Sequence, residues 1–114
     1  MKTIELDEIR HLKLDPNTIA DAETVCNLGL IAMVHPANIG MRPMRALLWA
    51  GLRHEIPGLT LEKTGVLMDM WTQKGHSFVE LEKIIIEAIE ETGWFKVDQM
   101  FGSPKEDQGP NGKA

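Results

Sequence analysis

The stretch that decides the fold is residues 40–65, GMRPMRALLWAGLRHEIPGLTLEKTG. Its apolar residues recur at the spacing of one helix face, which predicts a helix over residues 42–55. Pro57 ends this helix, because the residue before a proline is pushed out of the α region, and Gly58 suits the turn. Thr60 can cap the next helix with its hydroxyl. The stretch is therefore predicted to be a helical hairpin around which the rest of the chain packs.

The residues before this stretch predict one helix. They also include an N-terminal segment, residues 1–15, whose secondary structure has two interpretations. Apolar and polar residues alternate in residues 1–15, which favours a small β-hairpin, whereas residues 6–12 could instead form a short helix. The Asp-Pro-Asn run at 15–17 combines capping side chains with a proline suited to a first turn, and predicts a helix that ends before His35. Gly29 inside this helix either lets a neighbouring helix approach closely or marks a kink.

The residues after the stretch predict two more helices. Apolar spacing predicts a helix over residues 60–74, which a Lys-Gly pair ends. Ser77 and Glu80 form a capping box, in which each side chain satisfies a free backbone N–H. This box opens a helix over residues 78–91, with Gly93 as its C-terminal cap.

The predicted fold is mainly α, a small bundle of four to five helices with a short N-terminal β-hairpin as an option. The 114 residues leave room for one hydrophobic core, so residues 1–101 are predicted to form a single helical domain. The apolar cluster at 94–101 either docks as a short helix or forms an exposed patch. Residues 102–114 are rich in Gly, Pro and charge, which predicts a disordered tail.

The composition narrows the class of protein. The formal net charge is −5, and no basic cluster stands out, which argues against binding to nucleic acid. The single cysteine, Cys26, excludes a disulfide within the chain and fits a reducing cytosol. Without a signal peptide or an apolar run of about 18 residues, no membrane association is expected.

The residues that often carry chemistry do not assemble into a recognisable site. His54-Glu55 begins like a zinc-binding HExxH helix, but Gly58 stands where the second histidine would be. Cys26 lacks a CxxC partner and is expected to be a small buried hydrophobe. Neither a phosphate-binding glycine loop nor a nucleophile elbow is present. We therefore expect no enzymatic activity, metal or cofactor.

The apolar arc of the two central helices is wider than one packing contact needs. Methionine and tryptophan can fill a core, and this interpretation is preferred for some of the methionines, such as Met44. The same residue types can also form an adaptable surface for apolar partners. The residues predicted to bind a partner are Met41, Met44, Leu48, Trp49, Leu52, Met70 and Trp71.

Two groups of charges oppose the dipoles of their own helices. Arg42 and Arg45 lie in the first turns of one helix, while Glu87, Glu90 and Glu91 lie in the last turn of another. Solvent and salt could screen both groups of charges, in which case their placement implies no contact. Alternatively, the basic helix start meets the acidic helix end, either within the chain or across a subunit boundary.

The central stretch also carries a resemblance. RALLWAGLRHE, a Pro-Gly turn and LTLEKTG resemble the "(I/L)RALL(W/Y)AGL-H-ED" helix and "LTLEE-G" helix start of the tail assembly chaperones of long-tailed phages and prophages. HLKLDPNTIADAE is similar to the "LRFD-NAL-ELE" entry segment of that family. The resemblance covers roughly residues 13–91. The chain departs from the pattern at the Pro-containing loop 35–40 and where HEIPG replaces a more acidic "HEDP", which puts the register of the loops in doubt.

The resemblance implies a function, a location and partners. The chain would be a non-enzymatic, all-helical chaperone in the host bacterial cytoplasm. It would coat the apolar, helical tape measure protein and keep it soluble until the tail tube protein polymerises around it. The family often makes a longer, frameshifted form, of which this chain would be the short version, and a homo-oligomer is expected. The alternative is a generic helical adaptor or regulatory subunit that dimerises through a surface around Trp49 and Trp71.

Overall fold

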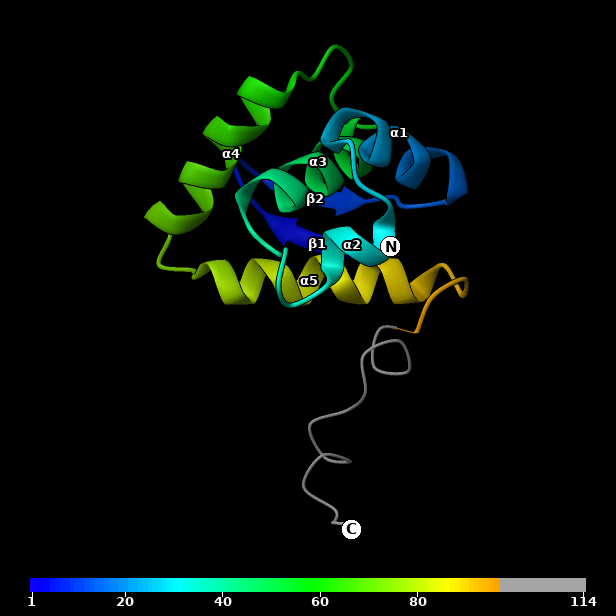
Figure 1. Ribbon diagram of the computed structural model, residues 1–114. Coiled ribbons are helices and arrows are strands. Elements are labelled where there is room, and N and C mark those ends of the chain that lie inside the picture. Colours follow the sequence, from blue (N-terminus) through cyan, green and yellow to red (C-terminus); the bar gives the residue numbers. More distant parts are fainter. Residues whose placement is uncertain (97–114) are drawn as a thin grey trace, which may run out of the picture.

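The computed structural model describes residues 1–96, in which an antiparallel two-stranded sheet is followed by helices (Figure 1). The elements are β1 (Lys2–Glu5), β2 (Ile9–Leu12), α1 (Pro16–Cys26), α2 (Leu30–Val34), α3 (Met41–Leu52), α4 (Leu61–Gln73) and α5 (Phe78–Glu91). This order confirms a small, mainly α fold with an N-terminal hairpin. The apolar residues after 96 and the predicted disordered tail at 102–114 lie outside the described residues.

The N-terminal segment is a β-hairpin, and the alternative of a short helix over residues 6–12 is wrong. The two strands pair antiparallel with Lys2 opposite Leu12. The side chains of Ile4, Leu6 and Leu12 are buried in the core. The hairpin is stable because its apolar face packs on α3 and α5, as an isolated two-stranded sheet would not be.

The helix predicted from residue 15 to His35 is two helices, because the chain breaks between Cys26 and Leu30. Asn27 adopts the left-handed conformation, with a φ of 59°, and its N–H donates to the Glu23 carbonyl. The Glu23 carboxylate then accepts from the Leu30 N–H at 2.7 Å and satisfies the first turn of α2. Gly29 is the N-cap of α2, so the segment holds a complete break in place of a kink.

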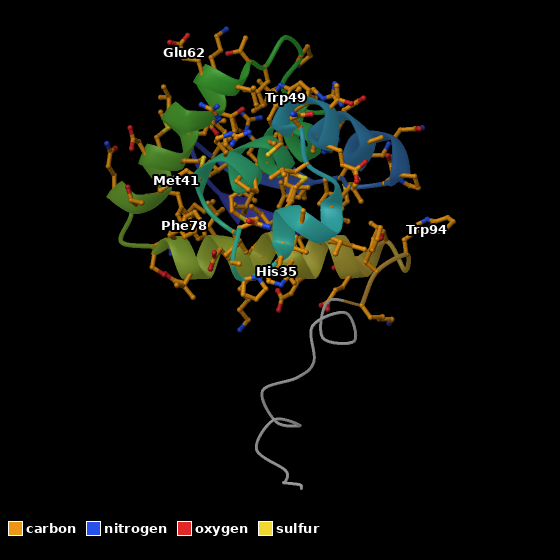
Figure 2. All side chains as sticks on the ribbon, viewed as in Figure 1. His35, Met41, Trp49, Glu62, Phe78 and Trp94 are labelled. Atoms are coloured by element: carbon orange, nitrogen blue, oxygen red, sulfur yellow. The ribbon has the colours of Figure 1, made fainter. Side chains whose placement is uncertain are left out.

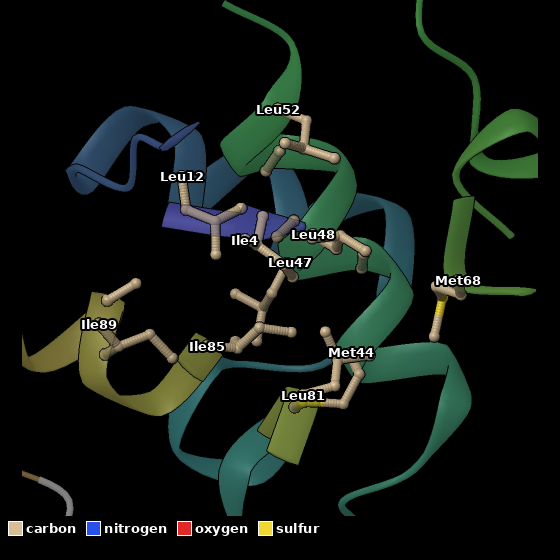
Figure 3. Close-up of a cluster of buried hydrophobic side chains, with 14 of the residues drawn as sticks. Ile4, Leu12, Met44, Leu47, Leu48, Leu52, Met68, Leu81, Ile85 and Ile89 are labelled. Atoms are coloured by element: carbon tan, nitrogen blue, oxygen red, sulfur yellow. The ribbon is translucent and has the colours of Figure 1, made fainter. Parts of the chain in front are cut away.

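Helix α3 is the centre of the molecule, with α1, the hairpin, α4 and α5 packed around it. Figure 3 shows its side chains meeting those of the hairpin and of α5. The helix ends at Leu52, three residues before the predicted end at Glu55. The residues after Leu52 instead hold the hairpin: the His54 ring nitrogen Nε2 donates to the His11 carbonyl at 2.7 Å. The Glu55 carboxylate accepts from the His11 backbone N–H at 3.1 Å and from its ring at 2.7 Å.

The predicted N-terminal caps of α4 and α5 are confirmed, whereas the C-cap of α5 is Thr92, one residue before the predicted Gly93. The Thr60 hydroxyl accepts from the Lys63 N–H at 3.0 Å. Ser77 and Glu80 form a reciprocal capping box, with a 2.6 Å bond from the Ser77 N–H to the Glu80 carboxylate and a 3.2 Å bond from the Glu80 N–H to the Ser77 hydroxyl. Gly93, with a φ of 81°, follows the C-cap of α5. These local signals place α4 and α5 as the sequence predicts.

Two of these carboxylates give an expected pH dependence. Backbone hydrogen bonds from His11 and Ser77 lower the pKa of Glu55 and Glu80, respectively, from the ordinary value of 4.5. A group whose pKa is lower in the folded state stabilises the fold above its unfolded pKa, and this contribution is lost as the pH falls through its folded pKa. We therefore expect the melting temperature to stay constant as the pH is lowered to about 5. Once the pH is below 4.5, the melting temperature should decrease. Glu55→Gln should flatten this fall in a circular dichroism series, and an equal fall in Glu55→Gln and in the control Glu82→Gln would contradict the assignment.

Candidate functional site

A groove of about 320 Å³ lies between the start of α3, one side of α4 and the start of α5. Figure 2 shows Met41 and Phe78 on the same side of the molecule, where these elements meet. We call it the α3–α4–α5 groove. It is lined by Met41, Arg42, Arg45, Gly65, Met68, Asp69, Trp71, Thr72, Phe78 and Leu81. Most of the lining residues are apolar, and the charged ones belong to α3 and α4.

Two local features shape the groove: Gly65 leaves space in it, and Trp71 is held in place on its wall. Gly65 leaves a gap in the wall of α4, since a Cβ added there would meet no atom within 4 Å. Trp71 is 3% exposed and held in place, because its Nε1 donates to the Ser77 carbonyl at 2.8 Å and its ring stacks on His76 at a centroid distance of 4.1 Å. The capping box at Ser77 starts α5 at Phe78, which lines the same groove as this indole. Trp71 is therefore a fixed part of the apolar wall.

The rim of the groove carries two arginines and one aspartate. Arg42 donates from Nη2 to the Cys26 carbonyl at 2.8 Å, where it interacts favourably with the carbonyl end of α1. This contact explains why a basic residue is found in the first turn of α3. Arg45 is half-buried, and the described residues include no hydrogen bond or ion pair for its side chain. With Asp69 as the only acidic residue lining the groove, the rim is basic overall.

The structure separates the residues predicted to bind a partner into three groups. Met41, 64% exposed, and Trp71 line the groove. Trp49 and Met70 are half-buried against the core and do not line it. The remaining three are fully buried core residues, so their prediction as surface residues is wrong; they are Met44, Leu48 and Leu52. Helical spacing identified the apolar face of α3 correctly, but that face packs inward on the hairpin and α5.

Trp49 fixes the connection between α3 and α4. Its indole Nε1 donates to the Leu59 carbonyl at 2.9 Å, and the Arg53 guanidinium lies 4.2 Å from its ring centroid. These contacts make it a structural residue of the loop before Thr60.

The groove also contains residues that sequence reasoning did not assign to it. These residues are Gly65, Met68, Phe78 and Leu81, none of which is among the residues predicted to bind a partner. One signal pointed to Phe78: a large aromatic residue directly after a capping serine lies at the outer end of its helix. The rest depend on how α4 is placed against α5, which the sequence does not encode locally.

The basic and acidic helix ends do not meet within the chain. Glu87 pairs with Lys2 Nζ at 3.0 Å, and Glu91 lies 3.8 Å from the N-terminal amino group. Glu90 lies in the same last turn of α5. Arg42 and Arg45 instead line the groove next to the first turn of α5, at the opposite end of that helix. The intramolecular form of this prediction is therefore wrong, and a contact across a subunit boundary is the form that stays untested.

Two absences hold for residues 1–96. Within this range there is no group of three or more His, Cys, Asp or Glu side chains placed to hold a metal ion. None of the helices described there is both long and apolar enough to cross a membrane.

The fold is a small, mainly α domain that carries an apolar groove with a basic rim. No family model, curated protein or solved structure matches the chain.

Proposed function

We propose that this protein is a non-enzymatic phage or prophage tail assembly chaperone that binds the apolar, helical tape measure protein. The observation that supports this most is the α3–α4–α5 groove, whose apolar wall of Met68, Trp71 and Phe78 suits one face of an amphipathic helix. The stretch RALLWAGLRHE, which resembles the chaperone family, forms most of α3 and its exit turn, and so builds the element on which the groove rests.

The composition supports the same role. A bound chain covers apolar surface of the client, while its net charge of −5 adds negative charge to the complex and keeps coated clients apart. The exposed thioether of Met41 adapts to different apolar side chains, which suits a client with many similar but unequal helical segments. Several copies would hold the tape measure protein soluble in the host cytoplasm until the tail tube protein assembles around it.

Co-expression with the tape measure protein of the same genome tests the proposal. We expect the client to become soluble and to co-purify with several copies of this chain. Met41→Asp should reduce capture about tenfold or more, because it places a charge against the apolar wall. Ile31→Asp is the matched control, since Ile31 is 55% exposed on α2 and does not line the groove. A client that stays insoluble, or equal capture by both variants, would refute the assignment.

A helical adaptor or regulatory subunit that dimerises through an apolar surface is the second candidate. Trp49 and Trp71 do not share one surface, because Trp71 lines the α3–α4–α5 groove whereas the Trp49 indole is tied to the Leu59 carbonyl. The observation that favours an adaptor is Trp94, which is 71% exposed after α5. In the co-expression experiment, an adaptor would neither make the tape measure protein soluble nor co-purify with it.

A further inference from the structure

Arg45 places a charge on the wall of an apolar hollow. It is half-buried on α3 and lines the α3–α4–α5 groove one helical turn after Met41. Within residues 1–96, neither a hydrogen bond nor an ion pair engages its guanidinium. Arg42, the other cation of the groove, instead donates to the Cys26 carbonyl at 2.8 Å. Arg45 is therefore the groove cation that has no partner in the described part of the chain.

Asp69, the acidic residue that α4 contributes to the groove, does not serve as this partner. It is exposed, and the described residues include no ion pair between its carboxylate and either arginine. An exposed carboxylate keeps water as its hydrogen-bond partner, whereas the half-buried guanidinium of Arg45 loses water once the groove is covered.

The cost of covering Arg45 selects the chemistry of the occupant. A helix with an entirely apolar face would remove water from the guanidinium and supply no acceptor, which is unfavourable. A helix with a basic residue at that point would add repulsion between like charges. A carboxylate there supplies two acceptor oxygens, whose geometry matches the planar guanidinium.

The shape of the site favours a length of chain over a small molecule. The groove residues of α4 form a stripe that covers two helical turns; they are Gly65, Met68, Asp69 and Thr72. Such a stripe is about 10 Å long at 1.5 Å per residue. A second hollow, of about 490 Å³, shares Met41 and Arg42 with the groove and is also lined by Leu28. A helical segment can extend over both hollows.

We propose that the α3–α4–α5 groove recognises apolar helical segments that carry an aspartate or glutamate beside their apolar face, and that Arg45 pairs with this carboxylate. The inference rests on the proposed function for the identity of the client, and it adds what a client segment must contain. Apolar residues of the segment pack on Met68, Trp71 and Phe78, while the carboxylate fixes the register of the segment along α3. Apolar contact attracts many segments, and the ion pair distinguishes among them.

Matched synthetic peptides test the inference with the full chain. Each peptide is an amphipathic helix of about 18 residues with the same leucine face, and one position beside that face is Glu, Gln or Lys. Fluorescence anisotropy of the labelled peptide measures the dissociation constant. We expect the Glu peptide to bind about tenfold more tightly than the Gln peptide, and the Lys peptide to bind most weakly.

Variants of the chain show whether Arg45 causes this preference. Arg45→Gln should abolish it, and Arg45→Glu should reverse it, so that the Lys peptide binds best. The reversal also shows that the variant is folded. Lys83→Gln is the matched control, because it removes an exposed positive charge that does not line the groove, and it should keep the preference.

Three results would overturn the inference: equal binding of the Glu and Gln peptides, a preference that survives Arg45→Gln, or no binding of any peptide. Displacement of the Glu peptide by micromolar octanoate would also overturn it, because the groove would then be a site for small apolar acids. Co-expression with the tape measure protein is scored separately. A Glu preference without client solubilisation refutes the chaperone function alone, and solubilisation without a Glu preference refutes this inference alone.

Discussion

Leu47→Ala is expected to lower the free energy of unfolding by about 2–5 kcal/mol. Leu47 is fully buried in α3, within the cluster that joins the hairpin to α5 in Figure 3. Truncating it removes the burial of its branched end and leaves a cavity that rigid neighbours on several elements cannot fill. The expected loss is a large share of the roughly 5–15 kcal/mol that stabilises a typical domain.

Urea denaturation followed by circular dichroism measures this loss. Val66→Ala is the control, because Val66 is 52% exposed on α4 and its truncation should change stability by no more than about 0.5 kcal/mol. Equal losses in the two variants would show that α3 is not the centre of the core.

Gly51→Val is expected to destabilise the protein by about 1–3 kcal/mol through overpacking. A Cβ at Gly51 would lie 3.2 Å from Leu12 Cδ2 and 3.4 Å from Leu14 Cδ2. The backbone leaves little room for adjustment there, because the Lys13 N–H donates to the Gly51 carbonyl at 2.9 Å and holds the chain after the hairpin against α3. The two further methyl groups of valine must displace these leucines or shift the strand.

Gly65→Ala is the matched variant, and it should have the opposite effect. Gly65 lies in α4 with no atom within 4 Å of an added Cβ. Alanine there should stabilise the protein by about 0.5–1 kcal/mol, because a helical glycine loses more conformational freedom on folding. Thermal melts of both variants check the pair, and a destabilising Gly65→Ala together with a neutral Gly51→Val would contradict the packing described for α3 and α4.

The candidate site could be predicted from the sequence only in part. Met41 and Trp71 were identified because methionine and tryptophan stood on a broad apolar arc, and both line the groove. Met44, Leu48 and Leu52 satisfied the same pattern and are core residues. Helical periodicity shows that residues share a face, but it does not show whether that face meets another element or solvent. That choice depends on the hairpin and α5, which come from distant parts of the chain.

The sequence by itself determined the features whose interactions lie within a few residues. The capping box of Ser77 and Glu80, the Thr60 cap and the proline start of α1 all appear where predicted, because each satisfies free backbone groups of its own first turn. Only the tertiary structure decided the early end of α3 and the partners of the charged helix ends. Each of those depends on contacts between residues brought together by packing, such as Glu55 with His11 across 44 positions of the chain.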